Sequence, residues 1–252
     1  MQWSAVFTSA VTYEQYLKHF RFVHKFLGMP NTWYTQSVVQ VRKGLARVDR
    51  SVPKKIALTS QVVRQMIRIV KNDDMELAGL MAIARMFLLR VPSEALPLEW
   101  DGQRSSIQLT QTTAVITLAK RKNRSSPSTL TRSCCCSTSG VALCAVHWLR
   151  KLAAKKKEGS KVFGLQVHKV RRHVKNAAKE AGVTDWEHVG THGLRRGMAQ
   201  DILDAGSPLT VLLRAGGWSS AAFLEYLRAD QCQDAAAGQA VIYLSDSDGD
   251  AC

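Results

Sequence analysis

The sequence predicts a mainly helical protein with a small antiparallel β-sheet, an α+β fold. Most of the chain places apolar residues three and four positions apart, the spacing typical of amphipathic helices. A central stretch, residues 106–136, instead carries β-branched residues in alternating positions, which is typical of strands. Hydrophobic residues make up 46% of the 252 residues, so we expect a packed core in one sizeable domain or two small ones.

Residues 1–50 are predicted to form a short helical region of their own. Apolar and aromatic residues recur through its first half, and Pro30 marks a turn. A second helix is predicted from about residue 37 to residue 48. The basic, proline-containing stretch 50–55 is interpreted as a linker.

The larger domain, residues 51–232, is predicted to begin with two helices. Residues 60–70 are amphipathic, and the polar residues 72–74 can cap the helix that follows. This second helix, residues 75–89, is apolar on most of its faces, and such a helix is buried. It would deliver Arg90 at its end.

Three short strands are predicted in the middle of the chain, over residues 106–110, 114–118 and 128–136. Turn residues separate the first two, so a three-stranded antiparallel sheet is expected. The basic turn 120–124 leads out of the second strand.

Helices are predicted to return after Gly140, and a short tail follows them. The expected helices cover residues 141–157 and 169–181, a stretch from about His192 to Gly206, one that begins at Ser207-Pro208, and one that begins at Ser219 and carries Tyr226. The tail, residues 233–252, is acidic near its end and is expected to be disordered there.

The charge balance favours a polyanionic partner. The chain has 35 Lys and Arg against 20 Asp and Glu, a net charge of +15, which suits nucleic acid or an acidic membrane surface. The alternative is a protein that merely has a basic surface. No stretch is long and apolar enough to span a bilayer, and the N-terminus lacks a secretory pattern. We therefore expect an intracellular protein, nuclear in a eukaryote or cytoplasmic in a prokaryote, whose six cysteines are reduced or metal-bound.

Four residues suited to phosphate chemistry occur in the chain. His192 and Arg195 lie three apart at a helix start, so they can share one phosphate and move a proton. Arg90 follows a buried helix and needs an anion, for which Glu94 is an internal candidate. Tyr226 can serve as a nucleophile only with cations nearby, because phenol is a poor nucleophile at neutral pH. Each residue alone also fits an ordinary structural role.

Taken in order, these residues resemble the tyrosine recombinase (phage integrase) family. The matching segments are "LLRVPSEALPLEW" at 88–100, "THGLRRGMAQDILDAG" at 191–206 and "LLRAGGWSSAAFLEYL" at 212–227. The resemblance covers about residues 52–230, and the last two segments are the most specific. The segments "RKNR", "STLTRSCCC" and "LCAVH" look more like recombinases of eukaryotic mobile elements than bacterial ones.

The resemblance implies a role for each residue. Arg90 and Arg195 would clamp the phosphate that is cut, and Tyr226 would attack it to give a 3′-phosphotyrosine and a free 5′-hydroxyl. His192 would assist proton transfer at the tyrosine. Trp218, through its indole N–H, would donate a hydrogen bond to the phosphate.

The general acid is a lysine near residue 120 by the same resemblance. We prefer Lys120, which directly follows the second strand, over Lys122, and both would lie on the same side of an extended strand. Two spacings depart from the family. Glu94 is four residues after Arg90 where three is usual, and Tyr226 is eight residues after Trp218 where nine is commoner.

The resemblance also implies partners and cofactors. The enzyme would need neither metal nor ATP for cutting, would act on double-stranded DNA and not on a membrane, and would assemble as a homotetramer on DNA. Residues 1–50 would be a reduced counterpart of the family's N-terminal DNA-binding domain. The alternatives are a catalytically inactive DNA-binding remnant of a mobile element and a type IB topoisomerase-like enzyme.

A structural zinc site is a separate hypothesis. Cys134 and Cys136 would point to the same face of a strand, while Cys144 and His147 lie three apart at a helix start, so that a tetrahedral Cys3His site is plausible. It would pin the sheet to the following helix and take no part in cutting. The alternative is a set of buried apolar thiols beside a helix histidine.

Overall fold

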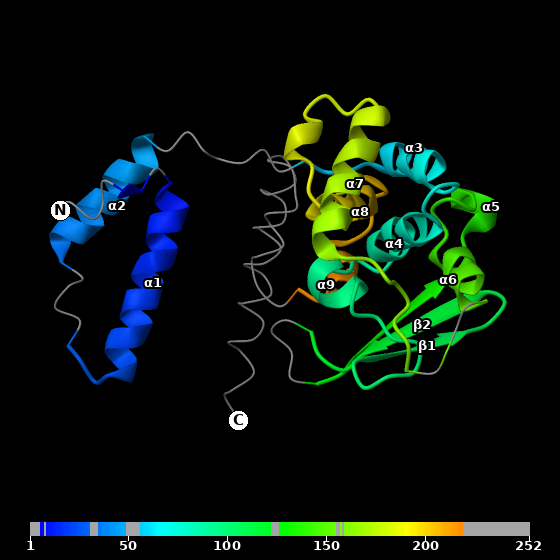
Figure 1. Ribbon diagram of the computed structural model, residues 1–252, viewed down its shortest axis with the longest axis horizontal. Helices are drawn as coiled ribbons and strands as arrows, with labels where there is room; N and C mark the ends of the chain where they lie inside the picture. The colour runs from blue at the N-terminus through cyan, green and yellow to red at the C-terminus, as the bar shows by residue number, and fades with distance from the viewer. Residues whose placement is uncertain are drawn as a thin grey trace. The chain divides into compact units, whose positions relative to one another are not determined.

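The chain divides into two compact units, residues 1–54 and 55–252, each of which is considered by itself (Figure 1). The computed structural model describes residues 6–7, 9–30, 35–48, 56–121, 126–154, 157 and 159–218. The first unit contains helices α1 (Ala10–Phe26) and α2 (Gln36–Val48). Tyr13 and Leu17 on α1 are buried, and the Phe7 ring packs edge-on against Tyr13.

The second unit begins with two capped helices, α3 (Ser60–Val70) and α4 (Met75–Met86). The Asp74 carboxylate accepts a hydrogen bond of 2.8 Å from the backbone N–H of Leu77, which fixes the first turn of α4. As its composition predicts, α4 is buried over most of its length. It ends three residues earlier than expected because Leu88 adopts a left-handed φ of 52°.

A three-stranded antiparallel sheet follows, with strand order β1-β2-β3. The strands are β1 (Ser105–Leu109), β2 (Thr113–Leu118) and β3 (Ser128–Ser133). The mainly helical fold with a small antiparallel sheet is therefore confirmed. The third strand is shorter than expected, because after the backbone N–H of Cys134 bonds to Thr112 the chain leaves the sheet and forms the short helix α5 (Cys136–Ser139).

Four longer helices complete the described part of the second unit. They are α6 (Ala145–Ala153), α7 (Val167–Glu180), α8 (His192–Asp204) and α9 (Leu209–Gly216). Helix α4 contacts α3, α6 and α8, while α6 also contacts all three strands (Figure 1). Helix α6 begins four residues later than expected because the residues after Gly140 form turns. Among the described helices, none is long and apolar enough to cross a membrane.

Two glycines allow α8 to lie against the backbone that precedes α3. The backbone N–H of Leu58 donates to the carbonyl of Gly193 at 3.0 Å. A Cβ atom on Gly197 would overlap the carbonyl group of Leu58, so only glycine fits there. The close approach sets the position of α8, and with it the position of Arg195 between them on the helix.

Candidate active site

Three arginine side chains meet around one buried carboxylate, and we call Arg90, Arg121, Arg195 and Glu94 the arginine cluster. Arg90 Nη1 lies 2.7 Å from Glu94 Oε1, Arg121 Nε lies 3.2 Å from the same oxygen, and Arg195 Nη1 lies 3.6 Å from Glu94 Oε2. These residues come from three segments that are far apart in the sequence. The fold therefore assembles a site that no single segment contains.

A π-helical turn brings Glu94 back to Arg90. The turn, η2 (Val91–Ala95), closes with hydrogen bonds from Ala95 N–H to Arg90 O at 3.0 Å and from Leu96 N–H to Val91 O at 2.9 Å. A π-turn holds one more residue than an α-turn. It therefore accommodates the four-residue spacing, and the Glu94 carboxylate accepts from both the backbone N–H and the guanidinium of Arg90.

Arg121 was not among the residues singled out in the sequence. It is 3% exposed, and its Nη2 also donates to the carbonyl of Gly216 at 3.2 Å. If the strand continued past Leu118, its alternation would turn the Lys120 side chain inward. However, β2 ends at Leu118 and the chain bends at Ala119. As a result, Lys120 is exposed and Arg121 is buried. The choice between Lys120 and Lys122 as general acid stays a prediction, because Lys122 lies outside the described residues.

Arg195 is fully buried and is held from two sides. Its Nη2 donates to the carbonyl of Gly216 at 2.8 Å, and its guanidinium lies over the Trp218 ring at 4.4 Å from the centroid. Such a cation–π contact favours a parallel, fixed guanidinium. The predicted pairing of Arg90, Arg195 and Trp218 in one site is thus present in the geometry.

The glycine pair before Trp218 is required by this packing. Gly217 ends α9 with a left-handed φ of 65°, and a Cβ there would come within 2.6 Å of Arg121 Nη1. A Cβ on Gly216 would overlap the Trp218 ring. The two glycines let Trp218 fold over Arg195 while the Gly216 carbonyl binds two arginines.

His192 stands at the first turn of α8 and is exposed. Partial desolvation lowers its pKa, and the positive charges of Arg195, Arg196, Arg90 and Arg171 lower it further. The imidazole is therefore mainly neutral at pH 7 and can accept a proton.

The arginine cluster carries an excess of two positive charges, because three guanidinium groups face one carboxylate. Burial alone would raise the pKa of Glu94, but the guanidinium of Arg121 and the hydrogen bonds from Arg90 outweigh it and hold this pKa below its ordinary value. Glu94 is thus ionised, and the four residues of the cluster together carry two more positive than negative charges. A site of this kind suits a phosphate group.

Comparison with protein families agrees with this geometry. The sequence profile of the phage integrase family matches residues 57–231. The chain belongs to the phage integrase family. Residues 57–231 accordingly form a tyrosine recombinase catalytic domain. No curated protein matches the chain.

Solved structures of tyrosine recombinases share the fold. One is the XerH site-specific recombinase bound to palindromic difH substrate in a post-cleavage complex, with 15% identity, a TM-score of 0.50, and coverage of 69% of this chain and 48% of that chain. Another is XerH bound to difH substrate in a pre-cleavage complex, with 15% identity, a TM-score of 0.49, and coverage of 66% and 48%. The chain therefore spans about half the length of these recombinases.

Tyr226, the predicted nucleophile, lies outside the described residues. The structure follows the chain as far as Trp218, which is 8% exposed and packs with Leu88, Ala199 and Leu212. The nucleophile assignment therefore stays a prediction.

The predicted zinc ligands are only partly brought together. The sulfur atoms of Cys134, Cys136 and Cys144 all lie within 4.8 Å of one another. The predicted strand does not reach these residues, because β3 ends at Ser133, Cys134 follows it and Cys136 begins α5. His147 is not part of this group.

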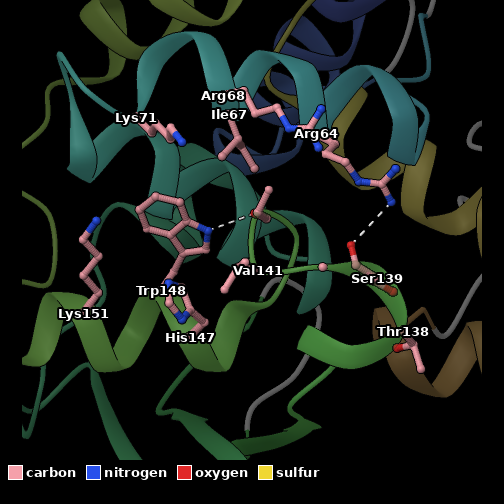
Figure 2. A pocket seen from close by; sticks show the side chains of 12 residues that line it. Arg64, Ile67, Arg68, Lys71, Thr138, Ser139, Val141, His147, Trp148 and Lys151 are labelled. Atoms are coloured by element: carbon pink, nitrogen blue, oxygen red, sulfur yellow. Dashed lines mark hydrogen bonds between the residues drawn. The ribbon is translucent and has the colours of Figure 1, made fainter.

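The His147 side chain instead lines a neighbouring pocket of about 650 Å³ between α3 and α6 (Figure 2). Trp148 lines the same pocket, and its indole N–H donates to Ala142 O at 2.9 Å. Desolvation lowers the pKa of His147, and the charges of Lys151 and Arg150 lower it further. The structure thus brings three of the four predicted ligands together and leaves His147 apart from them.

Proposed function

We propose that this chain cuts and rejoins double-stranded DNA through a covalent 3′-phosphotyrosine intermediate. The proposal rests above all on the arginine cluster, where Arg90 and Arg195 converge with two positive charges in excess beside a neutral histidine. A DNA phosphodiester carries one negative charge, and it gains a second as the pentacoordinate transition state forms. The excess matches the charge of that transition state.

Arg90 and Arg195 would bind the non-bridging oxygens of the phosphate that is cut. The Arg90 side chain is 19% exposed, so it can reach substrate while it holds Glu94. Arg195 is held by Gly216 and Trp218 and is fully buried, so a covering group such as the Trp218 ring would have to move before its guanidinium could touch the phosphate. Arg121 would keep Glu94 ionised and in place, as a positioning residue rather than a catalytic one.

The reaction would proceed in two balanced steps. The Tyr226 hydroxyl attacks phosphorus while His192 assists removal of its proton, and the bond to the 5′-oxygen breaks. Lys120 or Lys122 donates a proton to that oxygen, which leaves as a hydroxyl group. In the second step a 5′-hydroxyl attacks the phosphotyrosine, and Tyr226 leaves with a proton. The cations all come from side chains, and the phosphotyrosine bond keeps the energy for rejoining, so cutting needs neither metal nor ATP.

Trapping of the covalent adduct tests the nucleophile. A pool of duplexes with randomised sequence is nicked so that the released strand end diffuses away, and the adducts are isolated under denaturing conditions and sequenced. We expect adducts from the native protein and none from Tyr226→Phe, which should still bind DNA. Tyr243→Phe is the matched control and should form adducts normally.

Two other outcomes would change the proposal. An adduct that persists in Tyr226→Phe contradicts the nucleophile assignment. Salt-sensitive DNA binding with no adduct from any duplex favours an inactive DNA-binding protein, because phosphate contacts alone produce steep salt dependence.

A sulfur substrate separates the two lysines. When sulfur replaces the 5′-bridging oxygen, the leaving thiolate needs no proton, since a thiol is a much stronger acid than an alcohol. Cutting by the alanine variant of the true general acid, Lys120→Ala or Lys122→Ala, should be restored by this substrate. Cutting by Arg90→Ala should not be restored.

We also propose that the active form is a homotetramer on two DNA partners. The measurement is the mass of the complex that forms when the native chain is mixed with a duplex identified in the adduct-trapping experiment. A complex of one chain per duplex at saturating protein would contradict tetramer assembly.

A further inference from the structure

A cluster of thiols lies at the joint between the sheet and helix α6, at a place that the cutting reaction does not use. Cys134 follows β3, Cys136 begins α5, and Cys144 directly precedes α6. Cys144 Sγ lies 3.6 Å from Cys134 Sγ, and the sulfur of Cys136 lies within 4.8 Å of both. Three thiols thus converge from two segments.

The spacing of these sulfurs suits one tetrahedral metal ion. Zinc binds thiolate sulfur at about 2.3 Å, so two sulfurs of one tetrahedral site lie about 3.8 Å apart. The observed 3.6 Å between Cys144 and Cys134 is close to that value. It is far longer than the roughly 2.05 Å of a disulfide bond.

A backbone donor points at the Cys144 sulfur. This sulfur accepts a hydrogen bond from the backbone N–H of Cys135 at 3.4 Å, and Cys144 occupies the N-cap position of α6. Such a contact resembles the outer hydrogen bonds that orient metal-bound thiolates.

The thiol cluster is remote from the arginine cluster. Cys134 adjoins the end of the sheet where Thr113 pairs with Ser133, whereas Arg121 follows the other end, where Leu118 pairs with Ser128. Five residue steps along β2 separate these pairs, about 17 Å of strand. A metal there would act on the fold and not on the phosphate.

We propose that Cys134, Cys136 and Cys144 bind a structural Zn²⁺ as three thiolates. The soft sulfur ligands select zinc over magnesium or calcium, which prefer oxygen. The ion would link the end of β3 to the start of α6 and so stabilise the packing of the sheet against that helix. This site is independent of the proposed cutting reaction.

One further ligand completes the tetrahedron, and two neighbouring side chains can supply it. The Cys135 thiol interacts with that of Cys144. His147 is one helical turn beyond Cys144, on the same side of α6, and a side-chain rotation would carry its ring out of the pocket in Figure 2 toward the sulfurs. A water molecule is the third source.

Metal content and cobalt spectra test the site on the full-length chain. The native protein, purified under reducing conditions, should carry one zinc per chain, and Co²⁺ exchanged into it should show the intense thiolate-to-metal absorption of a tetrahedral sulfur site. Cys136→Ser and Cys144→Ser should each lower zinc content at least tenfold. Chelation of the native protein should lower its melting temperature without removing the ability of refilled protein to cut DNA.

Cys135→Ser and His147→Ala are the matched variants. At most one of these substitutions should weaken zinc binding, because the site needs only one further ligand. If both variants retain zinc, the fourth ligand is a water molecule. Loss of zinc in both variants to the extent seen in Cys136→Ser would overturn the three-thiolate site. Native protein with no zinc, or with Cys134 and Cys144 joined in a disulfide, would overturn it as well, even if the chain cuts DNA.

Discussion

Two buried sites in the catalytic domain use arginine in opposite ways. Arg85, on α4, is 1% exposed and donates to the carbonyl of Leu58 at 2.6 Å, to Ser60 Oγ at 3.0 Å and to the carboxylate of Asp201 on α8. One guanidinium there meets one carboxylate and neutral acceptors. Its charge is balanced.

The arginine cluster, by contrast, is not balanced. Glu94 is the carboxylate that Arg90, Arg121 and Arg195 share. The carbonyl of Gly216 accepts hydrogen bonds from two of these arginines, Arg121 and Arg195. A buried excess of charge costs free energy unless an anion arrives. The same residue type therefore holds two helices together in one place and, under the proposed function, forms a phosphate site in the other.

The largest expected effect concerns the balanced site. Asp201→Ala would leave the Arg85 charge buried without its carboxylate and should lower the free energy of unfolding by about 3 kcal/mol. Urea unfolding monitored by circular dichroism measures the change. Arg85→Met combined with Asp201→Leu should recover much of the loss, because an apolar pair removes both charges. A loss below about 1 kcal/mol in Asp201→Ala would show that this ion pair does not hold α4 to α8.

The next largest effect is expected in the arginine cluster and concerns the rate of DNA cutting. Arg90→Ala should lower the rate of DNA cutting by about 100- to 1000-fold, the usual cost of removing one group that stabilises transition-state charge. Its unfolding free energy should change little, since Arg121 still holds Glu94. Arg68→Ala removes the same charge from an exposed position and is the matched control. Equal losses of rate in both variants would mean that net charge, and not the cluster, matters.

A smaller effect is expected at the shared carboxylate. Glu94→Gln would remove the carboxylate that three guanidinium groups share and should cost about 1–3 kcal/mol of stability. Added sulfate or DNA should stabilise this variant more than the native protein. The measurement is the melting temperature with and without the anion, and equal shifts in both proteins would contradict an anion site.

The pH dependence of Glu94 follows from its lowered pKa. Its ionised form is favoured by folding, so its contribution is present above the pKa that it has in the unfolded chain. The contribution is lost as pH falls through the lower pKa of the folded state. The acid limb of the stability curve should therefore flatten in Glu94→Gln.

The smallest effect is expected at His192. Because its pKa is lowered in the folded state, the unfolded chain binds more protons as pH falls below the ordinary histidine range, and stability should decline there. His192→Gln should show a weaker decline. NMR titration of the His192 ring measures the pKa directly, and a value above that of an ordinary histidine would contradict the influence of the surrounding arginines.

The sequence predicts most of this fold because the relevant patterns are local. The amphipathic period of α3, the apolar surface of α4 and the alternation in β1 and β2 each follow from neighbouring residues. Ends of elements were less predictable. The left-handed Leu88 and the departure of the chain at Cys134 depend on packing between segments, which periodicity does not report.

The candidate site also contains residues that the sequence predicted and residues that depend on packing between segments. Arg90, Glu94, Arg195 and Trp218 lie together as their order in the sequence indicated. Arg121 was missed because a bend at Ala119 reverses which side chain points inward, and nothing in a run of basic residues marks the one that is buried. Arg85 was missed because its partner, Asp201, is remote in the sequence.

Trp218 has one more consequence, which concerns how the nucleophile is delivered. Its backbone N–H bonds to Leu213 O at 3.0 Å and its ring lies over Arg195, so the chain beyond it starts from an anchored point beside the cluster. Tyr226 is eight residues after Trp218, so the Cα atoms of the two residues lie at most about 29 Å apart. If Tyr226 is the nucleophile, as proposed, the indole sets the reach within which its hydroxyl must find the phosphate.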